Sequence, residues 1–352
     1  MRAYHLSFTV CVVLVVALSC AQDDGRDLSE PWAVDVNAPL PAPMVPAEPG
    51  ALSPTHASLI EPFDVGIQTN VESCAECHPT HVTEWRDSTH HFASFNNPFY
   101  RASFEDYVAE AGRERGRFCA GCHDPALLAG DILTKPIDAH EPRAHAGITC
   151  MSCHGIQEAR PTGVGSYALK AQSIERPRSD DPDSLRRHRE AMRGPARQGD
   201  ALCVSCHKGF LSAASGHSTF LPALDEHRPM RESSWGGSHA KRMALAPKTQ
   251  SCRGCHMEQD AQGHHSHRFA GGHSTLARSM KSQEQEAAIE ALVQNRIRLF
   301  IEPDSYRGDT LKARHVDVVI VNEGVGHRFP GGARDLRDTW VELELLDSEG
   351  RL

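Results

Sequence analysis

The chain has 352 residues, enough for two domains, yet hydrophobic residues make up only 39% of it and aromatic residues only 6%. These fractions are low for a conventional apolar core, so something other than side chains must help to fill the interior. The formal net charge of -9 and the lack of a basic stripe argue against a nucleic-acid partner.

The first 19 residues have the pattern of an export signal. Residues 1–19 join a short, weakly positive start to an apolar run that is too short to span a bilayer comfortably. The run ends in Val16-Ala-Leu-Ser-Cys20, which resembles the lipobox of bacterial lipoproteins. The resemblance implies cleavage before Cys20 and lipidation of its thiol. The alternative is an ordinary signal peptide in which Cys20 is incidental.

The next segment, residues 20–66, is rich in proline and alanine and has no periodic apolar pattern. We predict a semi-extended tether that holds the following domain away from a membrane to which Cys20 is attached. The protein is then exported, either facing the periplasm or as an outer-membrane lipoprotein of a Gram-negative type bacterium.

Residues 67–280 carry the most specific pattern of the chain, Cys-x-x-Cys-His, which occurs five times. In chain order, motifs 1 to 5 are Cys74–His78, Cys119–His123, Cys150–His154, Cys203–His207 and Cys252–His256. Two thiols so spaced can add to the two vinyl groups of one porphyrin, and the following imidazole can bind its iron. Zinc ribbons, redox dithiols and disulfide scaffolds also use paired cysteines, but none of them requires this histidine.

The motifs therefore predict five covalent c-type haems. The predicted thioether residues are Cys74, Cys77, Cys119, Cys122, Cys150, Cys153, Cys203, Cys206, Cys252 and Cys255, and the predicted proximal iron ligands are His78, His123, His154, His207 and His256. Such macrocycles can supply the missing core. We expect a multihaem cytochrome c fold of mainly short helices and loops packed on the haems, with helices at 104–111 and 184–193.

The spacing of apolar residues changes in the C-terminal part of the chain. An amphipathic pattern at 281–295 predicts a connecting helix, and alternating apolar residues from 296 to 352 predict strands at 297–301, 316–320 and 340–346. We predict an all-β, sandwich-like domain. Three strands make a poor sandwich, so either the sheet completes itself on the haem domain or the sequence is truncated, and we favour truncation.

The sixth coordination positions need further ligands. The chain has 22 histidines, of which five belong to the motifs. An iron held by two imidazoles is low-spin and closed to substrates. The candidate distal ligands are His90, His145, His217, His239, His267 and His327. For each of them a surface position or a contact to a haem propionate is the alternative, and methionine could replace histidine as a ligand.

The segment from Cys74 through Trp85 to His90 resembles the opening of the cytochrome c-554 family of multihaem cytochromes. The likeness continues around motifs 3, 4 and 5 and covers roughly residues 70 to 275. It implies closely stacked haems in a loop-rich, mostly helical fold, electron transfer between periplasmic or membrane partners, and a distal-ligand role for His90. The chain departs from the name-giving cytochrome, which has four motifs, and adds a C-terminal region with β periodicity.

Two functions remain open at this point. The first is electron transfer without catalysis, with redox proteins as partners, either other cytochromes or a membrane quinol-linked complex. The second is an oxidoreductase that acts on a small nitrogen or sulfur compound, such as nitrite, hydroxylamine or tetrathionate, at one open haem. The nitrite reductases that form ammonia usually have one motif ending in lysine, whereas every motif here ends in histidine. We predict no catalytic residue.

Overall fold

The computed structural model describes residues 50–61, 70–170, 174–215, 217–237, 249–301, 317–333 and 339–344. The predicted signal peptide, Cys20 and His239 lie outside these residues. Within the ranges given, no helix is both long and apolar enough to cross a membrane.

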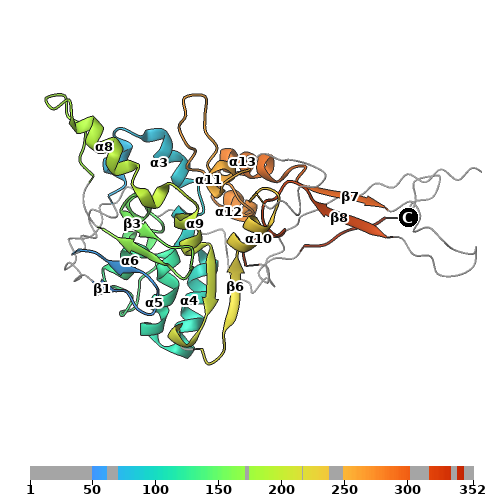
Figure 1. Ribbon diagram of the computed structural model, residues 1–352. Helices are drawn as coiled ribbons and strands as arrows, with labels where there is room; N and C mark the ends of the chain where they lie inside the picture. The colour runs from blue at the N-terminus through green and yellow to red at the C-terminus, as the bar shows by residue number, and fades with distance from the viewer. Residues whose placement is uncertain are drawn as a thin grey trace, which may run out of the picture.

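Short helices are the main regular structure of the described chain, as the sequence predicts (Figure 1). They are α2 Glu72–Ala75, α3 Pro79–Arg86, α4 Pro98–Ala111, α5 Arg113–His123, α6 Pro125–Ala129, α7 Cys150–His154, α8 Ser184–Met192, α9 Ala201–Cys206, α10 His227–Glu232, α11 Cys252–His256, α12 Ser274–Ser279 and α13 Gln283–Val293. Single 3-10 turns lie at His91–Ala93, Pro142–His145, Pro195–Arg197 and Ala213–Ser215.

Three small sheets accompany the helices. The strands β1 Gly50–Ala51, β2 Ser58–Leu59, β4 Tyr167–Leu169 and β3 Ile156–Ala159 form a four-stranded sheet in this spatial order, with β2 parallel to β4. The other two sheets are antiparallel pairs, β5 Lys208–Leu211 with β6 Leu221–Asp225 and β7 Ile297–Ile301 with β8 Val318–Asn322.

Residues 50–61 correct the predicted extent of the tether. They fold back as β1 and β2, and Leu52, Ala57 and Leu59 are buried in the main apolar cluster. Apolar side chains scattered between the prolines, together with the backbone pairing of β2 and β4, outweigh the extended preference of this composition. The folded domain therefore begins before residue 67.

The main apolar core combines buried side chains of α4, α5 and α6 with buried side chains of the four-stranded sheet. Asn97 caps α4 by accepting hydrogen bonds from the backbone N–H groups of Phe99 and Tyr100. The ring of Phe95 packs edge-on against Tyr100 and Phe104, with centroids 5.4 and 5.0 Å away. This cluster fixes α4 and α5, and α5 carries motif 2 at its C-terminal end.

The C-terminal region forms a hairpin that projects from the helical body in Figure 1. β7 and β8 occupy two of the three predicted strands, whereas residues 340–344 have no strand conformation. The side chains of Phe300 and Ile320 lie on opposite faces of this pair and are both exposed, so no second layer fully covers either face in the part of the chain described. The predicted sandwich is not confirmed, because two strands alone cannot enclose a core.

The core position of Phe95 gives a stability prediction. Its side chain is 1% exposed, so Phe95→Ala should lower the free energy of unfolding of the haem-loaded protein by about 3–5 kcal/mol. Phe220→Ala is the matched control, because Phe220 is 61% exposed. Denaturant titration measures both changes, and equal losses would contradict the proposed position of the core.

Candidate haem-binding site

One large cavity runs through the helical body. It measures about 2690 Å³ and is lined by all ten motif cysteines and all five motif histidines. Protein interiors are close-packed, and an ordinary ligand pocket occupies roughly 300–1,000 Å³. The exposed apolar side chains of Phe99, Leu185 and Val293 also line it. A space of this size and lining fits several large apolar groups, as covalent haems are.

Short helical turns present the attachment residues. In a helix, residues i, i+3 and i+4 share a face, so two cysteines and the following histidine point to the same side. Thr149 begins α7 with a reciprocal capping box to Ser152, and the side chain of Ser251 caps α11. The residue before the first cysteine therefore sets the start of the helix at motifs 3 and 5.

The motifs lie side by side. Thiol groups of different motifs lie close to one another, namely Cys74 beside Cys150, Cys122 beside Cys206, and Cys203 beside Cys252. These contacts place motif 1 against motif 3, and motif 4 against both motif 2 and motif 5. All ten motif cysteines are free thiols in the structure, so none of these contacts is a disulfide.

Four motif histidines each face a histidine from a distant part of the chain. An iron about 2 Å from each of two opposed imidazole nitrogens holds the ring centroids about 6 Å apart. The observed centroid separations are 6.0 Å for His78 and His188, 6.4 Å for His154 and His267, 6.1 Å for His207 and His90, and 6.3 Å for His256 and His327. The spacing suits one iron in each pair.

Three of the six candidate distal ligands, His90, His267 and His327, occur in these pairs. His145 does not line the cavity, and its Nε2 contacts the carbonyl oxygen of Ala139. His217 does not line the cavity either, and its ring lies 6.4 Å from that of Tyr107.

Sequence reasoning missed His188. A helical pattern could have found it, since Leu185, His188 and Met192 follow one face of α8 and line the cavity.

Motif 2 differs from the other four motifs. In the described ranges, no histidine ring pairs with His123, and the ring against it is Tyr100, with centroids 4.4 Å apart. The carboxyl group of the next residue, Asp124, is fully buried, and burial raises its pKa to about 7.

Backbone carbonyl groups orient three of the paired rings and also the ring of His123. The distance from Nδ1 to the backbone oxygen is 2.9 Å between His188 and Glu175 and 2.9 Å between His267 and His265. It is 2.7 Å between His256 and Ala270 and 2.8 Å between His123 and Ala93. A hydrogen bond donated by Nδ1 leaves Nε2 as the metal-binding nitrogen.

Burial keeps these imidazoles neutral, which is the form that binds metal. Desolvation lowers the pKa of His90 and of His154 to about 3 and that of His267 to about 4. It also lowers the pKa of His78 and of His207.

His327 has a different environment. A carboxylate oxygen of Glu226 lies 2.9 Å from its Nδ1, and the other carboxylate oxygen accepts a hydrogen bond from the backbone N–H of Gly332. Burial lowers the pKa of His327, but the contact with Glu226 outweighs it, and the net pKa is raised. A carboxylate partner makes an imidazole more electron-donating toward a metal than a carbonyl partner does.

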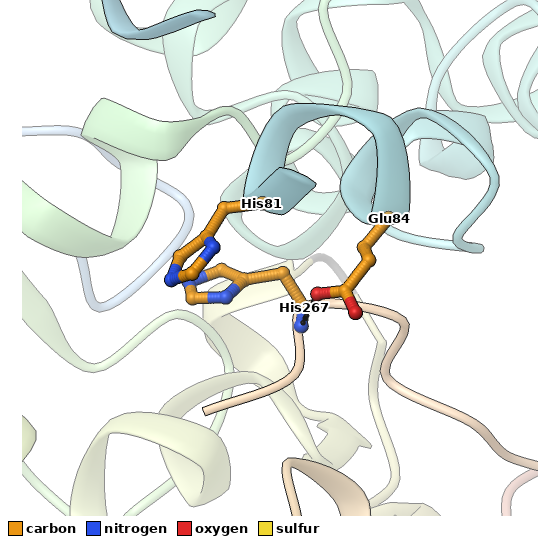
Figure 2. A group of neighbouring side chains, drawn as sticks. All are labelled: His81, Glu84 and His267. Atoms are coloured by element: carbon orange, nitrogen blue, oxygen red, sulfur yellow. Dashed lines mark hydrogen bonds between the residues drawn. The ribbon is translucent and has the colours of Figure 1, made fainter. Parts of the chain in front are cut away.

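Figure 2 shows His81 and Glu84 projecting from α3 toward His267. Ligand atoms of these three residues lie within 4.8 Å of one another, a spacing that could hold a small ion. However, Glu84 already accepts a hydrogen bond of 2.8 Å from the backbone N–H of His267, and the His267 ring also faces His154. We therefore interpret Glu84 as a residue that fixes the loop carrying His267.

The short helices and the shared cavity are the arrangement expected of a protein that holds several covalent haems. Residues 73–155, which hold motifs 1 to 3, match the family model described as cytochrome c554 and c-prime. The match confirms the predicted resemblance to multihaem c-type cytochromes, whose cofactor is haem c, and supports a redox role.

Among solved structures, the chain is similar to that of a penta-heme cytochrome c552 from Thermochromatium tepidum. The two are 20% identical, with 76% of this chain and 69% of that chain covered, and the TM-score is 0.49. No curated protein matches the chain.

The carboxylate at His327 gives a redox prediction. Glu226→Gln removes the negative charge beside the imidazole, so the oxidised form of an iron bound by His256 and His327 would be less stabilised and its midpoint potential should rise. Spectroelectrochemical titration measures the potentials. The control is Glu232→Gln on α10, an exposed carboxylate 2.8 Å from Arg228 that should leave every potential unchanged. An unaltered titration curve for Glu226→Gln would rule out this role.

Proposed function

We propose that this protein is a five-haem electron carrier. The observation that carries the proposal is the pairing of four motif histidines with a second histidine at centroid separations of 6.0 to 6.4 Å. Haem supplies reversible one-electron chemistry, and axial ligation by two imidazoles leaves no position for a substrate. The protein keeps the imidazole rings neutral and fixes their orientation, which suits electron transfer without catalysis.

Contacts between neighbouring sites support the transfer of electrons across the whole domain. The thiol contacts link motif 1 to motif 3 and motif 4 to motifs 2 and 5. Phe269 bridges motifs 3 and 4, because its ring lies 4.2 Å from His90 and 5.7 Å from His267, measured between centroids. The proposed haems thus form one connected group rather than isolated centres.

The partners and the location follow from the same proposal. An exported carrier exchanges electrons with other cytochromes or with a membrane quinol-linked complex. Lipidation of Cys20 would hold it at a membrane facing the periplasm or in the outer membrane. The lipobox-like sequence before Cys20 supports this arrangement.

Motif 2 favours a second candidate function. His123 has no histidine pair in the described residues, and the buried carboxyl group of Asp124 lies next to it in the chain. An open iron with a nearby proton source is what an oxidoreductase acting on a small nitrogen or sulfur compound requires. The electron carrier and the oxidoreductase differ only in whether the iron at motif 2 has an open position.

The haem count has a direct test. Intact mass spectrometry of the mature protein should show five covalently added haems, and the pyridine haemochrome spectrum should give the same number per chain. Cys122→Ala should shift the haemochrome band of one haem, since that haem keeps a single thioether. A count below five in the unmodified protein would contradict the proposal.

Electron paramagnetic resonance separates the two functions. The oxidised carrier should show low-spin haem only, and its reduced form should not change its absorption spectrum when carbon monoxide is added. A high-spin signal together with carbon monoxide binding at one haem would favour the oxidoreductase instead.

A further inference from the structure

His188 projects from α8 into the cavity beside motif 1. Its ring is nearly parallel to that of His78, with an interplanar angle of 9° and centroids 6.0 Å apart. Ordinary face-to-face stacking brings rings closer, whereas an iron between two imidazoles requires about this separation. The pair joins the first motif to a helix between motifs 3 and 4.

The face of α8 that carries His188 is suited to a large apolar ligand. Leu185, Arg189 and Met192 lie on the same face as His188 at helical spacing, and all of them line the cavity. Leu185 is 43% exposed, an unfavourable position for leucine unless a further group covers it. The macrocycle of motif 1 would provide that cover.

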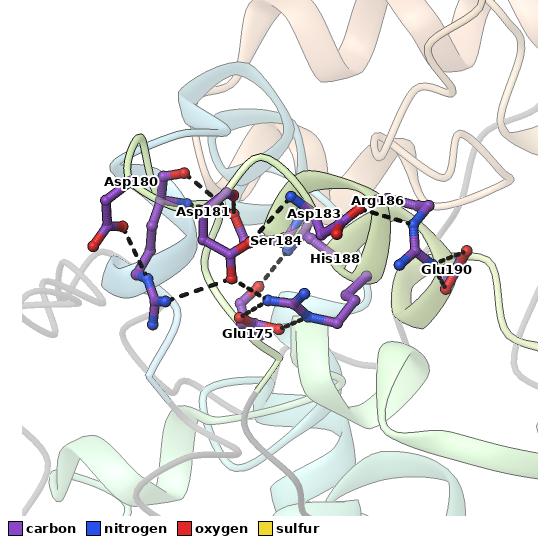
Figure 3. Close-up of polar contacts among 10 residues, drawn as sticks. Glu175, Asp180, Asp181, Asp183, Ser184, Arg186, His188 and Glu190 are labelled. Carbon is purple, nitrogen blue, oxygen red and sulfur yellow. Dashed lines mark hydrogen bonds and ion pairs between the residues drawn. The ribbon is translucent and has the colours of Figure 1, made fainter.

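A network of ion pairs holds the His188 ring in place (Figure 3). Nδ1 of His188 lies 2.9 Å from the backbone oxygen of Glu175. The carboxylate of Glu175 receives two hydrogen bonds of 2.7 Å from Arg187, whose guanidinium also binds Asp181 at 2.6 Å. Bidentate pairs of this kind restrict geometry more than single contacts do.

The same network fixes the start of α8. Arg178 donates its backbone N–H to the hydroxyl of Ser184 at 2.8 Å, and Ser184 is fully buried. The segment before α8 is therefore bound to Arg187, the residue before His188. These bonds keep the Glu175 carbonyl group in position to contact Nδ1 of His188.

Two other histidines lie near His78, but neither faces it in the same way. His81 is three residues further along the chain, in α3, so it shares the side of the haem that motif 1 occupies. His264 is largely exposed and lies 3.3 Å from the carboxylate of Asp260.

We propose that His188 is the second axial ligand of the iron held by motif 1, and that the ion pair between Arg187 and Glu175 positions it. This inference rests on the proposed function, because it requires a haem at Cys74 and Cys77. His188 is then a ligand, whereas Arg187 and Glu175 act only through it.

The test compares variants of the full-length, haem-loaded protein by electron paramagnetic resonance and by redox titration. His188→Ala should convert one low-spin haem into a high-spin one, with the haem count unchanged. His188→Met should keep that haem low-spin and raise its potential, because a thioether favours the reduced iron. His264→Ala is the matched control and should leave both readouts unchanged.

Arg187→Gln tests the positioning role. Loss of the bidentate pair should broaden or shift the low-spin signal of one haem while its proximal attachment stays intact. An unchanged signal in Arg187→Gln would overturn the positioning role, and an unchanged low-spin signal in His188→Ala would overturn the ligand assignment.

The failure of this inference and the failure of the proposed function are distinguishable. If the unmodified protein holds five low-spin haems and His188→Ala changes none of them, the carrier stands and only His188 is excluded. If the unmodified protein lacks the expected number of haems, the proposed function itself is wrong. His188→Met guards against misfolding, since it keeps a ligand at the same position.

Discussion

In the proposed haem-loaded protein one constraint governs the fold: two imidazoles from distant parts of the chain must lie about 6 Å apart, centroid to centroid, to bind one iron between them. His78, His154, His207 and His256 each meet it. Their partner histidines lie at positions from 90 to 327 in the chain, far from the motifs they face. Each proposed iron would therefore cross-link two remote segments. A chain with few apolar residues can hold a fixed shape through such links, as small metal-binding domains do.

The loop that carries His90 is held in place by the backbone before motif 3. Gly147 has a positive φ of 58°, and a Cβ atom there would lie 2.6 Å from the backbone oxygen of His90. Its neighbour Ile148 donates a backbone hydrogen bond of 2.8 Å to the same oxygen. The segment just before motif 3 thus supports the loop of His90, whose ring faces motif 4, so the glycine at this position connects motif 3 with the surroundings of motif 4.

The sequence predicted the local features of the site and three of the four partner histidines, but it missed His188 and did not predict which histidines face each other. Motif positions, α8 and the connecting helix depend on neighbouring residues, and the structure has all of them. The role of His188 depends on how α8 packs beside motif 1. The residues next to His188 in the sequence carry little information about this packing. For the same reason residues 50–61 read as a tether, although Leu59 pairs with Leu169 across a sheet. The predicted third C-terminal strand is not formed at 340–344 because alternation alone does not supply a pairing partner.

The most direct test of the account is diffraction from crystals of the haem-loaded protein with data collected at the iron absorption edge. The anomalous signal locates each iron without reference to the protein. We predict five irons, four of them midway between His78 and His188, His154 and His267, His207 and His90, and His256 and His327. Irons beside the motif histidines but away from these four partners would contradict the account.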